Sequence, residues 1–156
     1  MSNLTDIYDK IRLVIPTLAG FSAKTEIPNP YNLAQNNATF LREGYGVKIG
    51  QSTPQSSTDK PQYIVLTEFE IVLTERVAST SSNASPLIDV SKKIKKDIEI
   101  IENDFTATPL STSTRFSSAD KITYVNVVSS TGIGNLDVDK FNHITTSIIF
   151  GITHWK

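Results

Sequence analysis

The chain has 156 residues, of which 38% are hydrophobic and 20% are charged, and its formal net charge is −1. This length and composition predict a single domain, residues 1–156, with a core that needs no metal or disulfide. A net charge near zero provides no long-range attraction for nucleic acid or acidic membranes.

The chain contains no cysteine, which excludes disulfides and thiol catalysis, disfavours structural zinc, and fits synthesis in the cytosol. No basic and apolar leader opens the sequence, and no segment has the length of about 18 apolar residues that a membrane span needs. We therefore expect a protein that does not associate with membranes and needs no cofactor.

A first helix is predicted to begin near Asn3 or Thr5 and to end at Pro16, which cannot continue a helix. Its apolar residues recur at spacings of three and four, as one helical face requires: Leu4, Ile7, Tyr8, Ile11, Val14, Ile15 and Leu18. The chain from Gly20 to Pro30 is predicted to be irregular because it contains two prolines.

A strand is predicted to begin near Gly44, where Tyr45, Val47 and Ile49 alternate with Gly46, Lys48 and Gly50. The glycine-rich face indicates either the close approach of another backbone or a bulge. The polar segment Ser52–Pro61 is predicted to be a long hairpin loop.

The segment Gln62–Arg76, with the sequence QYIVLTEFEIVLTER, is predicted to be a second strand because its residues alternate between a mostly apolar face and a face with Glu68 and Glu70. At ~3.3 Å per residue it is roughly 50 Å long, more than is usual in globular domains. We expect part of this strand to project beyond the core with unpaired backbone groups, which invites another subunit.

A second helix is predicted from Ser85, with Ser85 as the cap and Pro86 at the first helical position. Its apolar stripe comprises Leu87, Val90, Ile94, Ile98, Ile101 and Phe105, and the opposite side is charged. We interpret the lysines of residues 92–96 as pairing with acidic residues of the same helix, Asp89, Asp97, Glu99 and Glu102.

Two final strands, Ile122–Ser129 and Phe141–Trp155, are predicted to form a hairpin after the connector Phe105–Lys121. The fold predicted from these patterns is α+β: two helices packed on a largely antiparallel four-stranded sheet, in the order α-β-β-α-β-β, with a long projecting β-hairpin.

Residues with chemical potential are interpreted as structural. Gly132–Ile133–Gly134 lacks the spacing of a phosphate loop and is predicted to be a hairpin turn. His143 and His154 are separated by roughly 35 Å of extended chain and cannot share a metal, so they are expected at the surface or rim. Asp137 and Asp139 lack the rest of a calcium loop. Glu68 and Glu70 lie about 7 Å apart on one face, but no catalytic partner is evident nearby.

The order of elements, the glycine-spaced segment Asn37–Gly50 (NATFLREGYGVKIG) and the long strand after it resemble the tail terminator, or tail-completion, proteins of tailed bacteriophages. This resemblance implies a small non-enzymatic α+β subunit that forms a ring, usually a hexamer, on the tail tube. The ring would stop tube growth and dock the head connector, so the protein would be made in the host cytoplasm and would belong to the virion, in the tail or neck.

The partners implied by the resemblance are sister copies, the tail tube protein and the head-tail connector protein, with DNA passing through the channel without specific binding. We expect Glu68 and Glu70 to face this channel and repel the DNA backbone. The interface residues that we predict are Gly46, Lys48, Gly50, Asp59, Lys60, Glu68, Glu70, Asn135 and Asp137.

Two alternative functions remain open at this stage. A head-tail connector or stopper protein of the phage neck would also be a small ring-forming subunit. A small α+β ligand-binding protein or enzyme would need a pocket with converging polar groups, for which the sequence nominates no residues.

Overall fold

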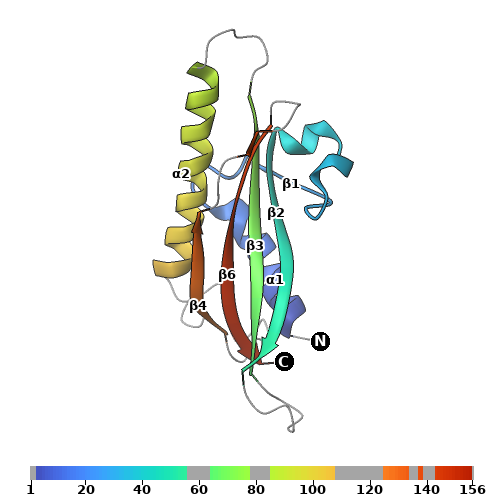
Figure 1. Ribbon diagram of the computed structural model, residues 1–156, viewed down its shortest axis with the longest axis vertical. Coiled ribbons are helices and arrows are strands. Elements are labelled where there is room, and N and C mark those ends of the chain that lie inside the picture. The colour runs from blue at the N-terminus through green and yellow to red at the C-terminus, as the bar shows by residue number, and fades with distance from the viewer. Residues whose placement is uncertain are drawn as a thin grey trace.

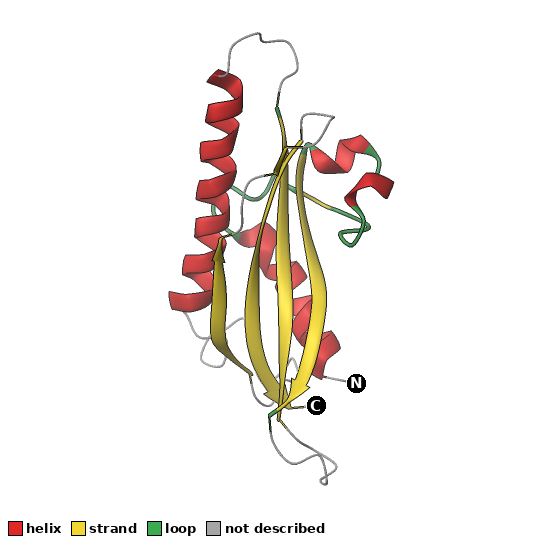
Figure 2. Ribbon diagram, in the orientation of Figure 1, coloured by secondary structure: helices red, strands yellow, loops and turns green. Residues whose placement is uncertain are grey.

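The computed structural model describes residues 3–55, 64–77, 85–107, 125–133, 137–138 and 143–155. It has an α+β fold in which two helices pack on one face of an elongated mixed sheet (Figure 1). The strands and helix α2 run along the length of the molecule (Figure 2). The predicted α+β class is confirmed.

The helices are α1 (Asn3–Val14) and α2 (Ser85–Ala107). The strands are β1 (Thr25–Glu26), β2 (Glu43–Pro54), β3 (Ile64–Arg76), β4 (Val125–Ile133), β5 (Asp137–Val138) and β6 (His143–Trp155). Three short 3-10 segments cover Ile15–Thr17, Leu33–Gln35 and Ala38–Leu41. The six long elements follow the predicted order, whereas the two-residue strands β1 and β5 were not predicted.

The sheet has the order β1-β2-β3-β6-β4, and β5 pairs with β6. The long strands are antiparallel to their neighbours, and β1 is parallel to β2. Strand β4 pairs with β6 and includes Gly132 and Ile133, so the hairpin turn predicted at these two residues is wrong. Gly134 lies outside the described residues.

Strand β3 is an interior strand, which corrects the prediction that its backbone is partly unpaired. It pairs with β6 along its whole length, from Ile64–Trp155 to Arg76–His143, and with β2 from Glu43–Glu75 to Pro54–Val65. The prediction failed because residues 52–54 look like a loop in composition yet continue β2. Pro54 fits there because it ends a strand at the sheet edge, where proline is tolerated.

The core lies between the helices and one face of the sheet, and it follows the predicted periodicities. Alternate residues Phe69, Ile71 and Leu73 of β3 are fully buried, which is the period of two that a half-covered strand requires. The partners that bury them come from both helices and from β6: Ile7, Ile11, Val14, Ile94, Ile98, Ile101, Phe105, Ile144, Ile148, Phe150 and Ile152. The rings of Phe105 and Phe150 meet edge to face at 5.1 Å.

The glycines of β2 explain how the other face is partly covered by the chain itself. A Cβ at Gly46 would lie 2.6 Å from Pro30, and a Cβ at Gly44 would lie 2.8 Å from Ile27. The segment after β1 therefore packs directly on the β2 backbone. Gly50 lies instead at the register shift between Ile49 and Ser52. Both predictions for the glycine face are therefore correct, the close approach of backbone at Gly44 and Gly46 and the bulge at Gly50.

We predict that Gly46→Ala lowers the free energy of unfolding by about 1–3 kcal/mol, because its methyl group overlaps Pro30 in a tightly packed contact. Gly50→Ala is the matched control, since its Cβ would meet Glu68 at 3.2 Å on an exposed part of the strand. Urea unfolding of both variants measures the difference. Equal losses would contradict the close packing of Pro30 on β2.

Candidate functional site

The face of the sheet that points away from the helices is only half covered. Toward the start of β2, Ile27 and Pro30 pack on the glycines, and Val72 and Thr74 of β3 are buried there. Toward the end of β2, the same face opens into a shallow hollow of about 240 Å³, lined by Tyr31, Lys48, Ile49, Gly50, Glu68, Glu70 and Ile149. We call this depression the sheet-face hollow.

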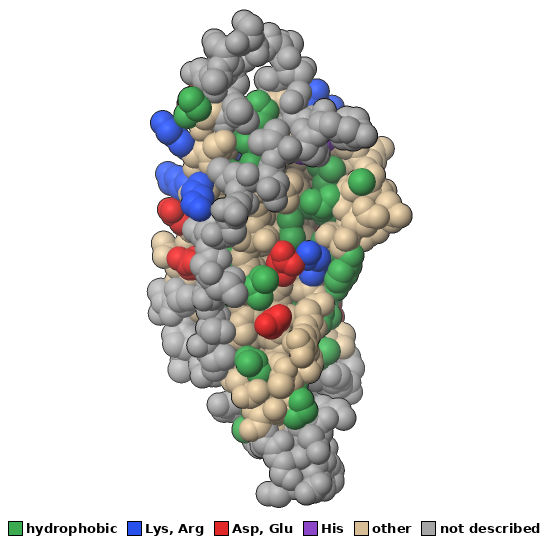
Figure 3. Space-filling view, viewed as in Figure 1, with side chains coloured by type: hydrophobic (Ala, Val, Ile, Leu, Met, Phe, Trp, Pro, Cys, Tyr) green, Lys and Arg blue, Asp and Glu red, His purple; other side chains and the backbone are tan. Residues whose placement is uncertain are grey.

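The sheet-face hollow combines charge, an aromatic ring and apolar surface. Lys48 Nζ lies 2.7 Å from Glu70 Oε2, directly across the β2–β3 ladder. The Tyr31 hydroxyl accepts a hydrogen bond of 2.9 Å from the Ile49 backbone N–H, while the side chain remains exposed. Glu68 is exposed and makes no ion pair among the described residues. Figure 3 shows acidic and basic side chains side by side over the strands in this part of the sheet.

The hollow brings together four of the predicted interface residues, Lys48, Gly50, Glu68 and Glu70. Gly46 is buried beneath Pro30, so its bare backbone is occupied by the same chain and is closed to a partner. Asp137 lies in β5 opposite Thr145 of β6. Asp59, Lys60 and Asn135 lie outside the described residues.

Of the two glutamates predicted to face a channel, Glu68 and Glu70, only Glu68 is without an ion pair in the described chain. The carboxylate of Glu70 is neutralised by Lys48 of the same chain, so the expectation that Glu70 repels DNA from a channel is wrong. The sequence contained the signal, since Lys48 and Glu70 face each other once β2 and β3 form a hairpin. Glu68 keeps its uncompensated negative charge.

The outer edge of β2 is the second exposed feature of this region. Strand β1 pairs with β2 only at Gly44 and Tyr45, so no strand of the described chain lies beside residues 46–54 on that side. Residues Gly50–Gln55 are all exposed. The edge therefore leaves backbone groups open to another chain, which is the property that sequence analysis assigned to β3.

A buried cluster of charges joins α2 to the end of β3, and sequence analysis missed it. Lys24 Nζ, whose side chain is 1% exposed, lies 3.0 Å from Asp97 and 3.8 Å from Glu75. Lys93 Nζ lies 2.8 Å from Glu75 and 3.7 Å from Glu43. The interpretation of Asp97 and Lys93 as a helix-surface charge pairing is thus wrong, because both residues pair with groups outside the helix.

Burial and ion pairing shift the pKa values of Glu75 and Lys93 in opposite directions. Burial raises the pKa of Glu75 above its ordinary value, and the hydrogen bond from Lys93 offsets only part of the rise. Burial lowers the pKa of Lys93, but the hydrogen bond to Glu75 and its charge outweigh this effect and leave the pKa raised. The two groups therefore stabilise each other's charges at the cost of desolvation.

Both histidines are buried, which corrects the expectation that they lie at the surface or rim. His143 is 4% exposed and His154 is 2% exposed. His154 lies on the core side, where its Nε2 is 2.8 Å from the Thr67 hydroxyl, and Thr67 is in turn 2.8 Å from the Ser52 hydroxyl. The prediction failed for His154 because β6 is an interior strand there, with β3 on one side and β4 on the other, which the spacing within one strand does not reveal.

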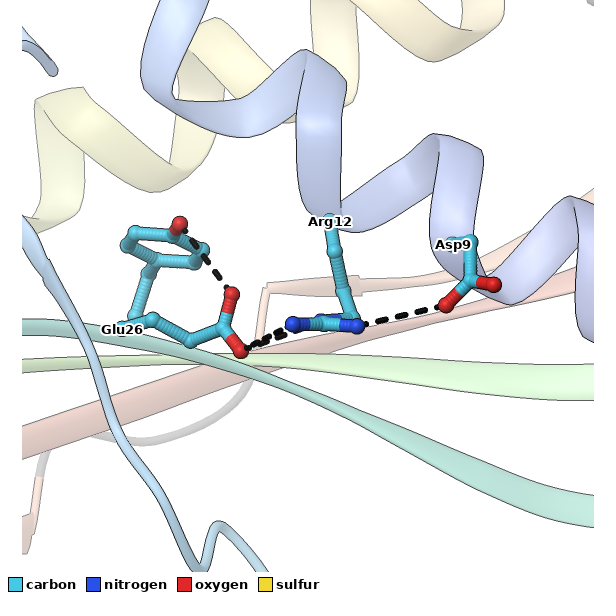
Figure 4. A network of polar contacts seen from close by, with 4 residues as sticks. Asp9, Arg12 and Glu26 are labelled. Atoms are coloured by element: carbon cyan, nitrogen blue, oxygen red, sulfur yellow. Dashed lines mark hydrogen bonds and ion pairs between the residues drawn. The ribbon is translucent and has the colours of Figure 1, made fainter.

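A separate polar network fastens α1 to the edge of the sheet (Figure 4). The Arg12 guanidinium donates to Glu26 at 2.7 and 3.0 Å and to Asp9 at 3.2 Å. The Tyr45 hydroxyl donates to the other oxygen of Glu26 at 3.4 Å, and burial together with this carboxylate raises the pKa of Tyr45. These contacts explain why the short strand β1 forms next to β2.

Within the described residues, no three His, Asp or Glu side chains gather as metal ligands would. None of the helices described there combines the length and apolar character needed to cross a membrane. A comparison of the sequence with models of known protein families gives no match, and a comparison with curated proteins gives none either.

We predict that Lys24→Met lowers the free energy of unfolding by about 3–5 kcal/mol, because it leaves the carboxylates of Asp97 and Glu75 buried without their shared cation. The double variant Lys24→Met/Asp97→Leu should recover part of this loss, since it removes the carboxylate that loses its cation, whereas Glu75 keeps its ion pair with Lys93. Urea unfolding of the single and double variants tests the coupling. Additive losses would contradict a shared buried cluster.

The raised pKa of Glu75 predicts how stability depends on pH. A group whose pKa is higher in the folded state than in the unfolded state contributes stability below its unfolded pKa, and loses it as the pH rises through its folded pKa. We compare the free energy of unfolding of the native chain with that of the Glu75→Gln variant. The native value minus the variant value should fall as the pH rises from about 4, the pKa of an unperturbed glutamate, through the raised pKa of Glu75 in the folded state. Denaturant unfolding at several pH values measures this difference, and a rise would contradict the assignment.

Proposed function

We propose that the chain is a structural subunit of a tailed-bacteriophage virion that forms a ring, of six copies, at the end of the tail tube. The ring stops growth of the tube and offers the docking face for the head connector. DNA passes through its channel without specific binding. The sequence basis of this proposal is the resemblance of Asn37–Gly50 and of the element order to tail terminator proteins.

The observation that carries the proposal is the outer edge of β2. No strand of the described chain lies beside residues 46–54 at this edge, and residues 50–54 of it are exposed. Nearer the start of β2, Gly46 and Val47 are buried, and the Ile49 N–H donates to the Tyr31 hydroxyl. Monomeric proteins usually block such an edge with charged side chains or cover it, but among residues 46–54 only Lys48 is charged, and it turns to Glu70. An assembly of sister copies provides the missing cover.

The half-open sheet face supports the same proposal. Its hollow contains apolar surface and an exposed tyrosine, a residue type enriched at protein interfaces. It also contains charged side chains, which can fix the register of a partner through complementary charges. The hollow and the edge of β2 adjoin each other, because Lys48, Ile49 and Gly50 belong to both. The part of the hairpin that is open to a neighbouring copy in the proposed ring is the far end of β2, where residues 50–55 are exposed. The far end of β3 is paired with β6.

The function is tested with phage particles that lack this protein. We expect tails longer than normal and heads without tails in electron micrographs, and we expect the added purified chain to restore head joining. Tails of normal length beside heads that have lost their DNA would instead assign the chain to a connector or stopper. Normal, infectious particles without the chain would overturn the proposal.

A further inference from the structure

We propose that neighbouring copies meet head to tail, with the outer face of α2 from one copy lying against the sheet-face hollow of the next. This inference rests on the proposed ring, and it names the two surfaces that build it. Because these surfaces are different parts of the subunit, their contact is heterologous, and repeated contacts of this kind close into a ring when the rotation between copies permits.

The outer face of α2 carries two lysines that have no ion-pair partner in the described chain, on a helix that also exposes Asp89 and Glu99. Lys92 and Lys96 are exposed, one helical turn apart, and neither makes an ion pair among the described residues. Lys93, by contrast, is held by Glu75. Figure 3 shows basic side chains along the α2 flank of the molecule with acidic side chains next to them, and further acidic side chains over the sheet.

The sheet-face hollow carries the complementary charge. It contains two carboxylates, Glu68 and Glu70, and a single ammonium group, Lys48, so its net charge is negative. Glu68 is exposed and lacks an ion-pair partner among the residues that the structure describes. A lysine that approaches Glu68 therefore gains attraction without breaking an existing pair, whereas one that approaches Glu70 shares this carboxylate with Lys48.

The spacings of the two charge rows agree. Residues two apart on a strand are separated by about 6.6 Å, which is the spacing of Glu68 and Glu70 on β3. Residues four apart on a helix are separated by about 6 Å along its axis, which is the spacing of Lys92 and Lys96. If α2 of one copy lies antiparallel to β3 of the next, Lys96 reaches Glu68 and Lys92 reaches Glu70.

The same alignment pairs two exposed apolar side chains. Ile88, 50% exposed, lies one turn before Lys92 on the same face of α2. Tyr31, 61% exposed, follows Pro30, which packs on Gly46 opposite Val72. Its hydroxyl reaches the Ile49 N–H, opposite Phe69, so the side chain spans the strand beside Glu70 from the level of Val72 to that of Phe69. An antiparallel α2 places Ile88 at Tyr31, whereas a parallel α2 would place it near Glu68. The apolar pair therefore favours the antiparallel arrangement.

A charge exchange tests the contact. Glu68→Lys and Lys96→Glu are each expected to weaken association of the copies at least about fivefold, because each replaces an attraction by a repulsion. The double variant Glu68→Lys/Lys96→Glu should restore association. Arg42→Glu is the matched control, since it makes the same change of charge as Lys96→Glu at another exposed position. Sedimentation of the purified chain, alone and on tail tubes, measures association.

Cross-linking tests the orientation, and the absence of natural cysteine leaves no background. Thr53 lies opposite Leu66, next to Glu68, and Glu99 lies one turn beyond Lys96. Thr53→Cys/Glu99→Cys should therefore form a ladder of oligomers with a short bismaleimide, whereas each single variant should not. Thr53→Cys/Ile88→Cys places the second cysteine at the far end of the contact and should form no ladder.

The outcomes separate this inference from the proposed function. Rings on tail tubes without a 53–99 cross-link, or with dimers from a single cysteine, would overturn the α2 contact and leave the ring in place. The absence of both rings and cross-links on tail tubes would overturn both proposals. Retained association of Lys96→Glu with reduced retention of DNA would show that the lysines of α2 bind nucleic acid instead, and would also overturn the contact.

Discussion

The pairing of β3 on both sides is the constraint on which the rest of the structure depends. Strand β3 lies between β2 and β6 in a continuous antiparallel ladder, so its backbone groups are satisfied within the chain. Successive side chains of β3 point to opposite faces of the sheet and so form two rows. One row, centred on Phe69, Ile71 and Leu73, requires the cover of both helices, and the other row faces away from them. A slip of one residue would exchange the two rows and expose the core.

The second row makes the subunit asymmetric along its length. At the end of β3, Val72 and Thr74 are buried, because the neighbouring glycines allow the segment after β1 to lie on the strand. Toward the start, Glu68 and Glu70 replace the apolar residues and that cover stops. The half-open face is thus a consequence of where glycines and carboxylates occur along β2 and β3. The Arg12–Glu26 network contributes to the same asymmetry by fixing β1 at one end of β2 only.

The sequence predicted the features that depend on local periodicity. The apolar stripes of α1 and α2, the start of β2 near Gly44 and the presence of a long last strand all follow from spacings within one element. The pairing of elements was less accessible. The interior position of β3 depends on its pairing with β6 along its whole length and on the continuation of β2 to Pro54. Which strands become neighbours does not follow from the spacing within one element, and residues 52–54 have the composition of a loop.

For the candidate site too, the sequence predicted single residues but not the contacts between segments. The hollow gathers Lys48, Gly50, Glu68 and Glu70, which the glycine and acid patterns had indicated. The ion pair between Lys48 and Glu70 needed the hairpin register, and the contribution of Tyr31 needed a tertiary contact over 18 residues. The buried triad of Lys24, Glu75 and Asp97 left no local signal at all, because its members come from three segments far apart in the chain.

The lysines of α2 lie on two different sides of the helix, although they are close together in the sequence. Lys93 lies on the side of the helix that faces the end of β3, so it contributes to the buried cluster and its charge is used within the subunit. Lys92 and Lys96 are displaced around the helix and remain exposed. Exposed charges of this kind contribute little to stability. Glu68 on the sheet is likewise exposed and has no ion-pair partner among the described residues. The buried cluster is thus neutralised within the subunit, whereas Lys92 and Lys96 on α2 and Glu68 on the sheet have no ion-pair partner among the described residues. Partnerless charges of opposite sign on two different surfaces favour contact between different faces of identical copies over contact between like faces.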